Sequence, residues 1–290
     1  MHRDIRLQVA PDRFVVLHYH IFKNGGSTID YALRRNFGNA FADFHGRHSD
    51  ARLFARDIVA LVRADASISA LSSHHIRYPK PHAQGFVFFD ICFVRHPLSR
   101  IRSLYHYGRT LDPADWLARL ARAHDEGGFV AHLLRHLPHM LTDVQINHIV
   151  NGAEFARAAG PQDLHAASAI LADMSVPGVV ELFDESLTAA EFFLGPCFPQ
   201  IDFAYIAQNV FAPGGHRPSG RVDLLDVCRT AWGSESFDAV LALNAWDMRL
   251  YEAAREEVLR RLRMLPAHEA QLAAFRERCR SLSPVQPGKE

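Results

Sequence analysis

The feature of this sequence that most constrains its fold is the apolar run FVFFDICFV, which ends at Val94. The run contains Asp90 and is far shorter than the roughly 20 residues of helix that cross a membrane. Its β-branched and aromatic residues predict instead a strand over 86–95 that is buried on both faces, as the central strands of parallel sheets are. Pro97 follows at a position suited to the first turn of a helix, which we expect over 97–108.

A second strand is predicted by the apolar run from Phe14 to Tyr19. A loop over 20–26 follows it and leads into a helix that ends near Asn36. Ser27 or Thr28 is expected to cap that helix, because hydroxyl side chains accept hydrogen bonds from the free amides of a first turn.

The rest of the chain continues the alternation of strands and helices. We expect a helix over 50–64, an extended segment over 67–78, a strand over 176–183 and a helical C-terminal third. Helices are also expected over 113–173, interrupted at Gly127-Gly128, at Pro138 and at Gly160-Pro161. Such alternation is typical of a parallel sheet covered by helices on both faces. The sequence therefore predicts an α/β protein with a P-loop-like three-layer fold, one domain over 1–283 and a disordered tail over 284–290.

Composition narrows the possible partners. Lys and Arg number 32, as do Asp and Glu, so no net charge attracts the chain to nucleic acid or to acidic membranes. The four cysteines include no CxxC pair, which disfavours zinc and a disulfide framework. The N-terminus lacks the apolar core of a signal peptide. We therefore expect a cytoplasmic protein with no membrane span and no nucleic-acid partner.

The loop KNGGST has the composition of a phosphate cradle. Gly25 and Gly26 allow backbone amides to approach an anion, the helix start adds unpaired donors, and Lys23 adds a charge. The lysine precedes both glycines, whereas the nucleotide-kinase motif GxxxxGK[ST] places it after the second. Taken alone, a glycine turn that only connects strand and helix explains this loop equally well.

A second segment, FVRHPLSRIRSLY, offers a partner for that loop. Arg95 ends the predicted strand and Ser103 lies on the predicted helix. The two converge on one phosphate if the strand end faces the first two helical turns, because a guanidinium and a hydroxyl both donate to phosphate oxygens. A solvated basic helix face is the alternative for this segment alone.

Together the two segments resemble the motifs of the glycan O-sulfotransferases related to the heparan sulfate type. HIFKNGGST resembles their HxPKTGGT loop, and FVRHPLSRIRSLY is similar to their RDPxxRxxSxY segment. Weaker similarities follow in family order, in VVELFDESL with Glu181, in QNVFAP and in NAWDMRLYEAA. The sequence departs from the family pattern at Phe22, Asn24, His96 and Asn147. The first three are compatible with cofactor binding, whereas Asn147 stands where the family often has an arginine and concerns the acceptor site.

The resemblance implies a donor cofactor, 3′-phosphoadenosine 5′-phosphosulfate (PAPS), and residues that bind it. The phosphosulfate would lie on the first loop, at Lys23, Asn24, Gly25, Gly26, Ser27 and Thr28. The ribose phosphate would lie on Arg95 and Ser103. Lys23 would also be catalytic, since it neutralises the charge that develops on the leaving phosphate.

Sulfuryl transfer also needs a base for the acceptor's proton, and histidine suits this role near neutral pH. The segment SSHHIRY offers His74 and His75. The family has Gly-His at a similar place with an aromatic residue three positions later. Tyr78 is three residues after His75, which favours His75 as the base. A shift of one residue exchanges the two, so His74 remains a candidate.

No metal is expected. His132 and His136 have the spacing of two ligands on one helix face, but no HExxH motif accompanies them. His45 and His48 are expected to contact the acceptor, and residues 111–160 to shape its cleft.

These observations predict an enzyme, a sulfotransferase that moves a sulfuryl group from PAPS to a hydroxyl of a carbohydrate or glycoconjugate by in-line displacement. Two alternatives stay open. One is a nucleotide-dependent kinase or phosphotransferase with a P-loop-like fold. The other is a non-catalytic binding protein with the sulfotransferase fold.

Overall fold

The computed structural model describes residues 13–44, 51–150, 152, 157–208 and 223–282. Its centre is a sheet of five strands in the order β2-β3-β1-β4-β5, and every pairing between them is parallel. The strands are β1 (Arg13–Tyr19), β2 (Phe41–Asp43), β3 (Ala70–Ser73), β4 (Phe86–Val94) and β5 (Val176–Val179). The expected α/β fold with a parallel sheet is therefore confirmed.

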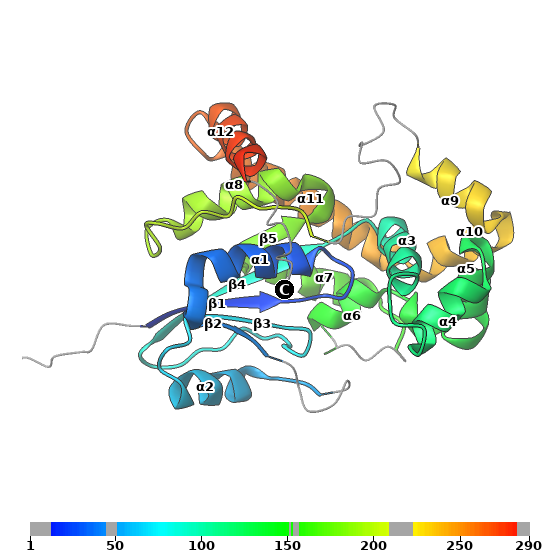
Figure 1. Ribbon diagram of the computed structural model, residues 1–290, viewed down its shortest axis with the longest axis horizontal. Helices are drawn as coiled ribbons and strands as arrows, with labels where there is room; N and C mark the ends of the chain where they lie inside the picture. The colour runs from blue at the N-terminus through cyan, green and yellow to red at the C-terminus, as the bar shows by residue number, and fades with distance from the viewer. Residues whose placement is uncertain (1–12, 45–50, 151, 153–156, 209–222, 283–290) are drawn as a thin grey trace, which may run out of the picture.

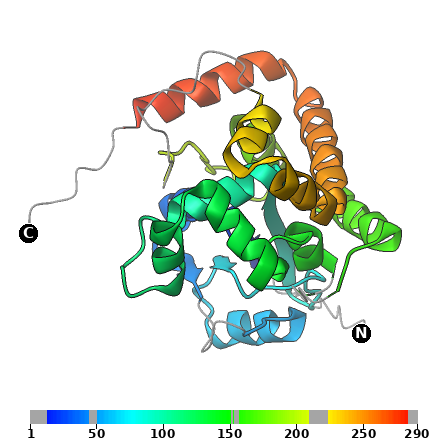
Figure 2. The ribbon, with the colours of Figure 1, turned by 90° about the vertical axis from the view of Figure 1, so that its right-hand side faces the viewer.

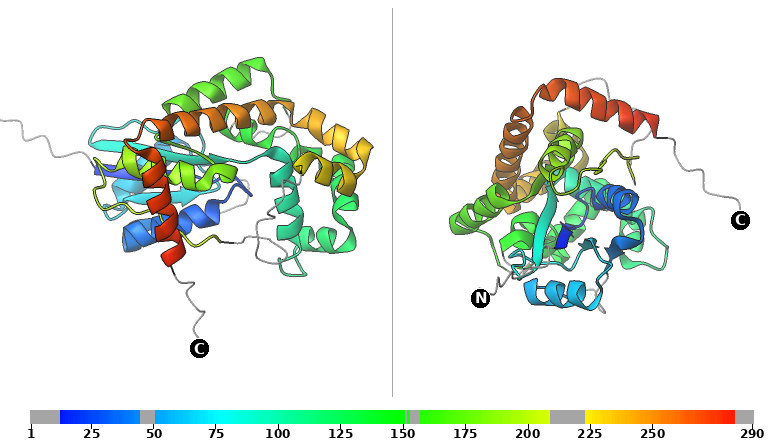
Figure 3. Two further views of the ribbon diagram at one scale, coloured as in Figure 1. Left: turned by 90° about the horizontal axis from the view of Figure 1, so that it is seen from above. Right: turned by 90° about the vertical axis from the view of Figure 1, so that its left-hand side faces the viewer.

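Helices cover both faces of this sheet, because alternate strand residues point to opposite sides. Val16 faces a core shared with the first group of helices, whereas Val15 and Leu17 face a core shared with the second. The first group is α1 (Gly26–Phe37), α8 (Phe183–Leu194) and α12 (His268–Ser281). The second group is α2 (Ala55–Ala64), α6 (Val144–Val150), α7 (Pro161–Asp173) and α11 (Ala245–Arg263). Figure 1 shows α8 and α12 above the strands and α2 below them, and Figure 3 shows α12 in red lying against α8.

Five further helices form a separate apolar core, which includes Leu98, Phe129 and Phe237. They are α3 (Pro97–Gly108), α4 (Trp116–Ala123), α5 (Glu126–His136), α9 (Leu224–Trp232) and α10 (Ser234–Leu243). We call them the helical lobe. The lobe lies beyond the carboxyl ends of the strands, at the right of Figure 1 and facing the viewer in Figure 2. Ligands of open parallel sheets bind at this edge.

Most predicted elements are found, with shifted ends. The helix expected over 50–64 begins at Ala55, and the strand expected over 176–183 ends at Val179, where a 3₁₀ turn, η3 (Val180–Leu182), follows. Two other 3₁₀ turns are η1 (Gly38–Ala40) and η2 (Pro138–Met140). The tail over 284–290 lies outside the described residues. No helix in the described ranges is long and apolar enough to cross a membrane.

Two local predictions are wrong. Helix α1 has Gly25 as its N-cap, with φ of 75°, and no side chain caps it, so Ser27 and Thr28 lie inside the helix. Gly127 and Gly128 do not interrupt a helix but form the first turn of α5. A β-carbon on Gly127 would lie 2.5 Å from the carbonyl oxygen of Ala231, so this glycine allows α5 and α9 to approach closely.

Candidate active site

A cleft of about 560 Å³ opens at the carboxyl ends of the strands, between the sheet and α3 of the helical lobe. The glycine loop and the start of α1 line one side through Lys23, Gly25, Gly26, Ser27 and Thr28. Arg95 and Ser103 line it from the second segment, and His74 lines it from the end of β3. The structure thus brings together eight of the ten predicted site residues, and Asn24 and His75 are the two that do not line the cleft.

The loop between β1 and α1 has an unusual backbone. Lys23 and Gly25 both have positive φ, at 69° and 75°. The first amides of a helix generally lack an acceptor within the helix and can bind an anion. In α1 the amide of Thr28 donates to the carbonyl of Gly25 at 3.0 Å, and no helix bond is expected for the two amides before it. A β-carbon on Gly26 would lie 1.9 Å from Nε2 of His20, so only glycine allows the imidazole to occupy that space.

Asn24 is an anchor of the loop, and its predicted contact with a cofactor has no support in this geometry. Its side chain is 1% exposed, and Nδ2 donates to the carbonyl of Phe93 at 2.8 Å and to Oε1 of Gln145 at 2.7 Å. The same Oε1 accepts from the amide of Arg95 at 2.7 Å. Gln145 therefore ties the loop to the end of β4.

Lys23 and Arg95 meet at the base of the cleft. Arg95 donates from Nη1 to the carbonyl of Lys23 at 3.1 Å and from Nε to Oγ of Ser99 at 3.0 Å. The Lys23 ammonium lies 3.7 Å from the ring centre of Tyr107, a cation–π contact. Burial, and secondly the charge of Arg95, lower the pKa of Lys23 to about 8. Two cations held this close stabilise a bound anion.

The acidic residue Glu181 interacts with Arg95 but is not among the residues that line the cleft. Both its carboxylate oxygens accept from the amide of His96, at 3.2 Å. Burial raises the pKa of Glu181, and the nearby Arg95 charge offsets part of that effect. No aspartate or glutamate is among the described residues that line the cleft. The described part of the cleft lining is therefore cationic and includes none of the carboxylates that hold magnesium in phosphotransferases.

The two candidate bases differ in position. His74 lines the cleft, and its Nδ1 donates to the carbonyl of His20 at 2.8 Å, which leaves the lone pair on Nε2. Burial, followed by the charge of His20, lowers the pKa of His74 to about 3. His75 instead donates from Nδ1 to the carbonyl of Ala51 at 2.8 Å and holds the segment before α2. The geometry favours His74 over the predicted preference for His75.

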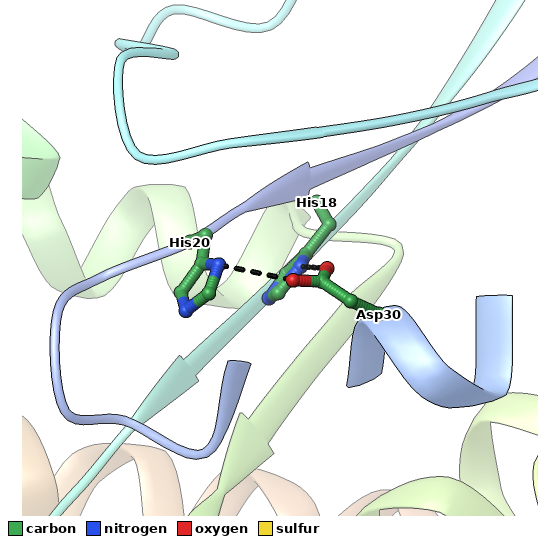
Figure 4. Close-up of side chains that lie close together, drawn as sticks. All are labelled: His18, His20 and Asp30. Atoms are coloured by element: carbon green, nitrogen blue, oxygen red, sulfur yellow. Dashed lines mark hydrogen bonds and ion pairs between the residues drawn. The ribbon is translucent and has the colours of Figure 1, made fainter. Parts of the chain in front are cut away.

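His20 also lines the cleft, and it is not among the site residues expected from the sequence. His18 and His20 are two residues apart on an extended segment, so both point toward α1, where Asp30 lies between them (Figure 4). Nδ1 of His18 lies 2.8 Å from Oδ1 of Asp30, and Nδ1 of His20 lies 3.3 Å from Oδ2. The HxH pattern at the end of a strand was the available signal.

Imidazole and carboxylate groups also bind metal ions. Among the described residues, His18, His20 and Asp30 form a group whose ligand atoms lie close enough together to hold one. Both Nδ1 atoms already face carboxylate oxygens at hydrogen-bond distance, and Nδ1 of His18 also lies 2.9 Å from Oγ of Ser72. The contacts in the structure are those of a hydrogen-bonded cluster.

Helix α3 supplies further cleft residues that the sequence reading missed. Arg102, His106 and Tyr107 line the cleft one helical turn beyond Ser99 and Ser103. Arg102 pairs with Glu126 at 2.8 Å, and the indole nitrogen of Trp232 donates to the same carboxylate at 2.9 Å. Spacings of three and four residues from Ser99 and again from Ser103 were the signal for this face.

Other predicted positions lie elsewhere. The rings of His132 and His136 are 4.5 Å apart on α5, away from the cleft lining. His45 and His48 lie outside the described residues. No described residue of the segment 111–160 lines the cleft, so its expected role in shaping the acceptor site has no support here.

Comparisons with known proteins give one distant relative. An uncharacterized protein of Archaeoglobus fulgidus is 28% identical over 247 residues, which is 83% of this chain and 96% of that protein. No family model matches the sequence, and no solved structure matches it.

Proposed function

We propose that this chain is a sulfotransferase that moves a sulfuryl group from PAPS to a hydroxyl of a carbohydrate or glycoconjugate in the cytoplasm. One observation carries the proposal. The two segments that resemble the donor-binding motifs of glycan O-sulfotransferases meet in a single cleft, where Arg95 donates to the carbonyl of Lys23 at 3.1 Å. Neither segment alone favours this function over a simple turn or a basic helix face.

The cleft residues suit the donor's two anionic ends. The first-turn amides of α1 and the Lys23 ammonium form the cradle for the phosphosulfate. Arg95 and Ser103 donate to the ribose phosphate. Sulfuryl transfer, like phosphoryl transfer, has a loose transition state in which positioning and charge stabilisation contribute most. Lys23 then acts on the bridging oxygen, where negative charge develops as the sulfur–oxygen bond breaks.

His74 is the proposed base. With a pKa of about 3 it is neutral at pH 7, and its free lone pair on Nε2 can accept the acceptor's proton. The negative charge of the donor favours the imidazolium that forms on His74 as the acceptor loses its proton.

The test is calorimetric titration with adenosine 3′,5′-bisphosphate, the expected product, and with ATP in the presence and absence of magnesium. We expect selective binding of the bisphosphate without metal, weakened at least tenfold in Arg95→Ala, since an arginine–phosphate pair is among the stronger polar contacts. Arg56→Ala is the matched control, because that arginine on α2 is 86% exposed.

Transfer is then measured with radiolabelled PAPS and a panel of carbohydrate and other hydroxyl acceptors. A preference for magnesium-ATP would support the phosphotransferase instead. Bisphosphate binding without turnover on any acceptor would support the non-catalytic binding protein.

A further inference from the structure

The proposed reaction uses His74 and assigns no role to His20, although His20 lies in the same cleft and is held there by close contacts. The His20 side chain is 11% exposed, borders the cleft, and faces Asp30 through Nδ1 at 3.3 Å. Because that nitrogen donates to a carboxylate, Nε2 is the second functional atom of the ring. This atom lies where a β-carbon of Gly26 would be, at 1.9 Å from that position. Nε2 of His20 is thus held against the first turn of α1, the turn proposed to bind the phosphosulfate.

The charges around His20 come from several elements. The anionic groups are Asp30 on α1 and Asp43 at the end of β2. The titratable or cationic groups are His18 on β1, His74 after β3, His148 on α6 and Lys23 in the loop. Burial keeps the pKa of His148 well below its ordinary value, so that imidazole is neutral.

Asp30 stays ionised beneath this group. Burial opposes its charge, but the charge and hydrogen bonds of His18 and His20 outweigh burial and hold the pKa of Asp30 well below its ordinary value. For His20, burial lowers the pKa and the hydrogen bond to Asp30 offsets part of that effect. An anion placed at Nε2 adds a second negative neighbour, and a neutral Nε2 with its lone pair would repel it.

We propose that His20 is a ligand of the donor's 5′-phosphate, which it binds through Nε2 as an imidazolium held between that phosphate and Asp30. This inference rests on the proposed function, since it assigns a further residue to the same donor site. Binding of the donor then draws one proton from solvent onto His20. The added proton on Nε2 hydrogen-bonds a non-bridging oxygen and stabilises the charge of the leaving phosphate.

The same geometry divides the roles of two neighbouring imidazoles, whose rings are tilted by 35°. The ring centres of His20 and His74 are 3.7 Å apart, so a charge on one disfavours a charge on the other. The Asp30 carboxylate contacts His20, whereas His74 donates to the neutral backbone carbonyl of His20. The proton therefore goes to His20, and His74 stays neutral as the base. Opposed environments of this kind separate acid and base roles in other active sites.

The experiment measures proton uptake on binding. The intact protein is titrated with adenosine 3′,5′-bisphosphate at pH 7 in buffers of different ionisation enthalpy, which gives the number of protons taken up. We expect about one proton per bisphosphate, as linkage requires of a group that becomes charged on binding. His20→Gln should lose this uptake and bind about tenfold or more weakly. His74→Gln should keep the uptake.

Further variants guard against a folding artefact. Asp30→Asn keeps the shape of the cluster but removes its charge, and it should also reduce proton uptake. Nitrogen chemical shifts of ¹⁵N-labelled histidine should show one ring becoming protonated on binding in the wild type and in His74→Gln, but not in His20→Gln.

The outcomes separate this inference from the proposed function. Tight bisphosphate binding without proton uptake, or with uptake unchanged in His20→Gln, overturns the inference and leaves the donor site intact. If the bisphosphate does not bind but ADP or inorganic pyrophosphate does, with uptake that depends on Asp30, then the inference stands and the choice of PAPS is wrong.

Discussion

Asp143, just before α6, caps the start of α11, and Asp247 in α11 caps the start of α6. Oδ1 of Asp143 accepts from the amides of Trp246 and Asp247 at 3.1 and 2.9 Å, at the start of α11. Asp247 returns the contact at the start of α6, where Oδ2 accepts from the amide of Gln145 at 3.0 Å and Oδ1 from that of Ile146 at 2.8 Å. Because Gln145 also binds Asn24, this reciprocal cap supports the loop that lines the cleft.

The pair predicts an unusual pH dependence of stability. Burial, with the charge of Asp247 among the other causes, raises the pKa of Asp143 from 3.8 to about 6. The folded state therefore binds protons more tightly than the unfolded state in this window, and stability falls as pH rises from about 4 to about 6. Asp143→Asn keeps an oxygen for the cap and removes the charge. We expect it to be more stable than the wild type at pH 7, by on the order of 1 kcal/mol, and equal to it at pH 4.

Urea unfolding at both pH values measures this difference. Asp143→Ala is the matched control, because it removes the acceptor and should lower the free energy of unfolding by about 1–3 kcal/mol at both pH values. Equal losses in the Asn and Ala variants would show that the charge itself is needed.

The close approach of His20 to Gly26 predicts that a larger residue at position 26 weakens bisphosphate binding. In Gly26→Ala the new β-carbon would lie 1.9 Å from Nε2 of His20, so the imidazole must leave its place beside the first turn of α1. We expect bisphosphate affinity to fall at least tenfold, because both the cradle and a charged ligand are disturbed. Gly160→Ala is the control, since its β-carbon would meet only Oδ2 of Asp163, at 3.9 Å. Wild-type affinity in Gly26→Ala would mean that the anion binds elsewhere.

The sequence predicted the elements that local patterns determine. Apolar runs identified β1 and β4, and the lysine and glycines identified the loop between β1 and α1. It did not predict contacts between distant residues. The hydrogen bond of Asn24 to Gln145 joins positions 121 apart, and the cap from Asp143 to Asp247 joins positions 104 apart. Nothing in the local pattern of either segment reveals such partners.

The preference between His74 and His75 meets a different limit, since His74 and not His75 is among the residues that line the cleft. Adjacent residues at the end of a strand point in different directions, so an error of one position exchanges a cleft residue for an anchor. The family spacing to Tyr78 was not a guide to which ring faces the cleft. In the folded protein His20 packs against Gly26 and lies beside His74 in the cleft. The contact between His20 and His74 joins residues far apart in the sequence, so the sequence pattern does not reveal it.

Lys23 predicts how donor binding depends on alkaline pH. Its pKa of about 8 in the unliganded protein results first from burial and then from Arg95. Only the charged ammonium attracts the anion, so above pH 8 the loss of the Lys23 charge should add up to about tenfold per pH unit to the fall in bisphosphate affinity that proton uptake by His20 already causes. Lys23→Met should bind weakly and lose this added alkaline slope. Titrations from pH 7 to pH 10 test this, and a steepening above pH 8 that persists in Lys23→Met would assign it to another group.

The two adjacent histidines give the sharpest mutational comparison. His74→Gln should reduce transfer by about a hundredfold to ten-thousandfold, the usual contribution of a general base, while bisphosphate binding is retained. His75→Gln removes the hydrogen bond to the carbonyl of Ala51, so it should lower the free energy of unfolding by about 1 kcal/mol and leave turnover per folded molecule unchanged. Each variant is thereby the control for the other, measured by radiolabelled transfer and urea unfolding. The reverse pattern, with turnover lost in His75→Gln and kept in His74→Gln, would assign the proton to the ring outside the cleft and require the loop around Ala51 to move when the acceptor binds.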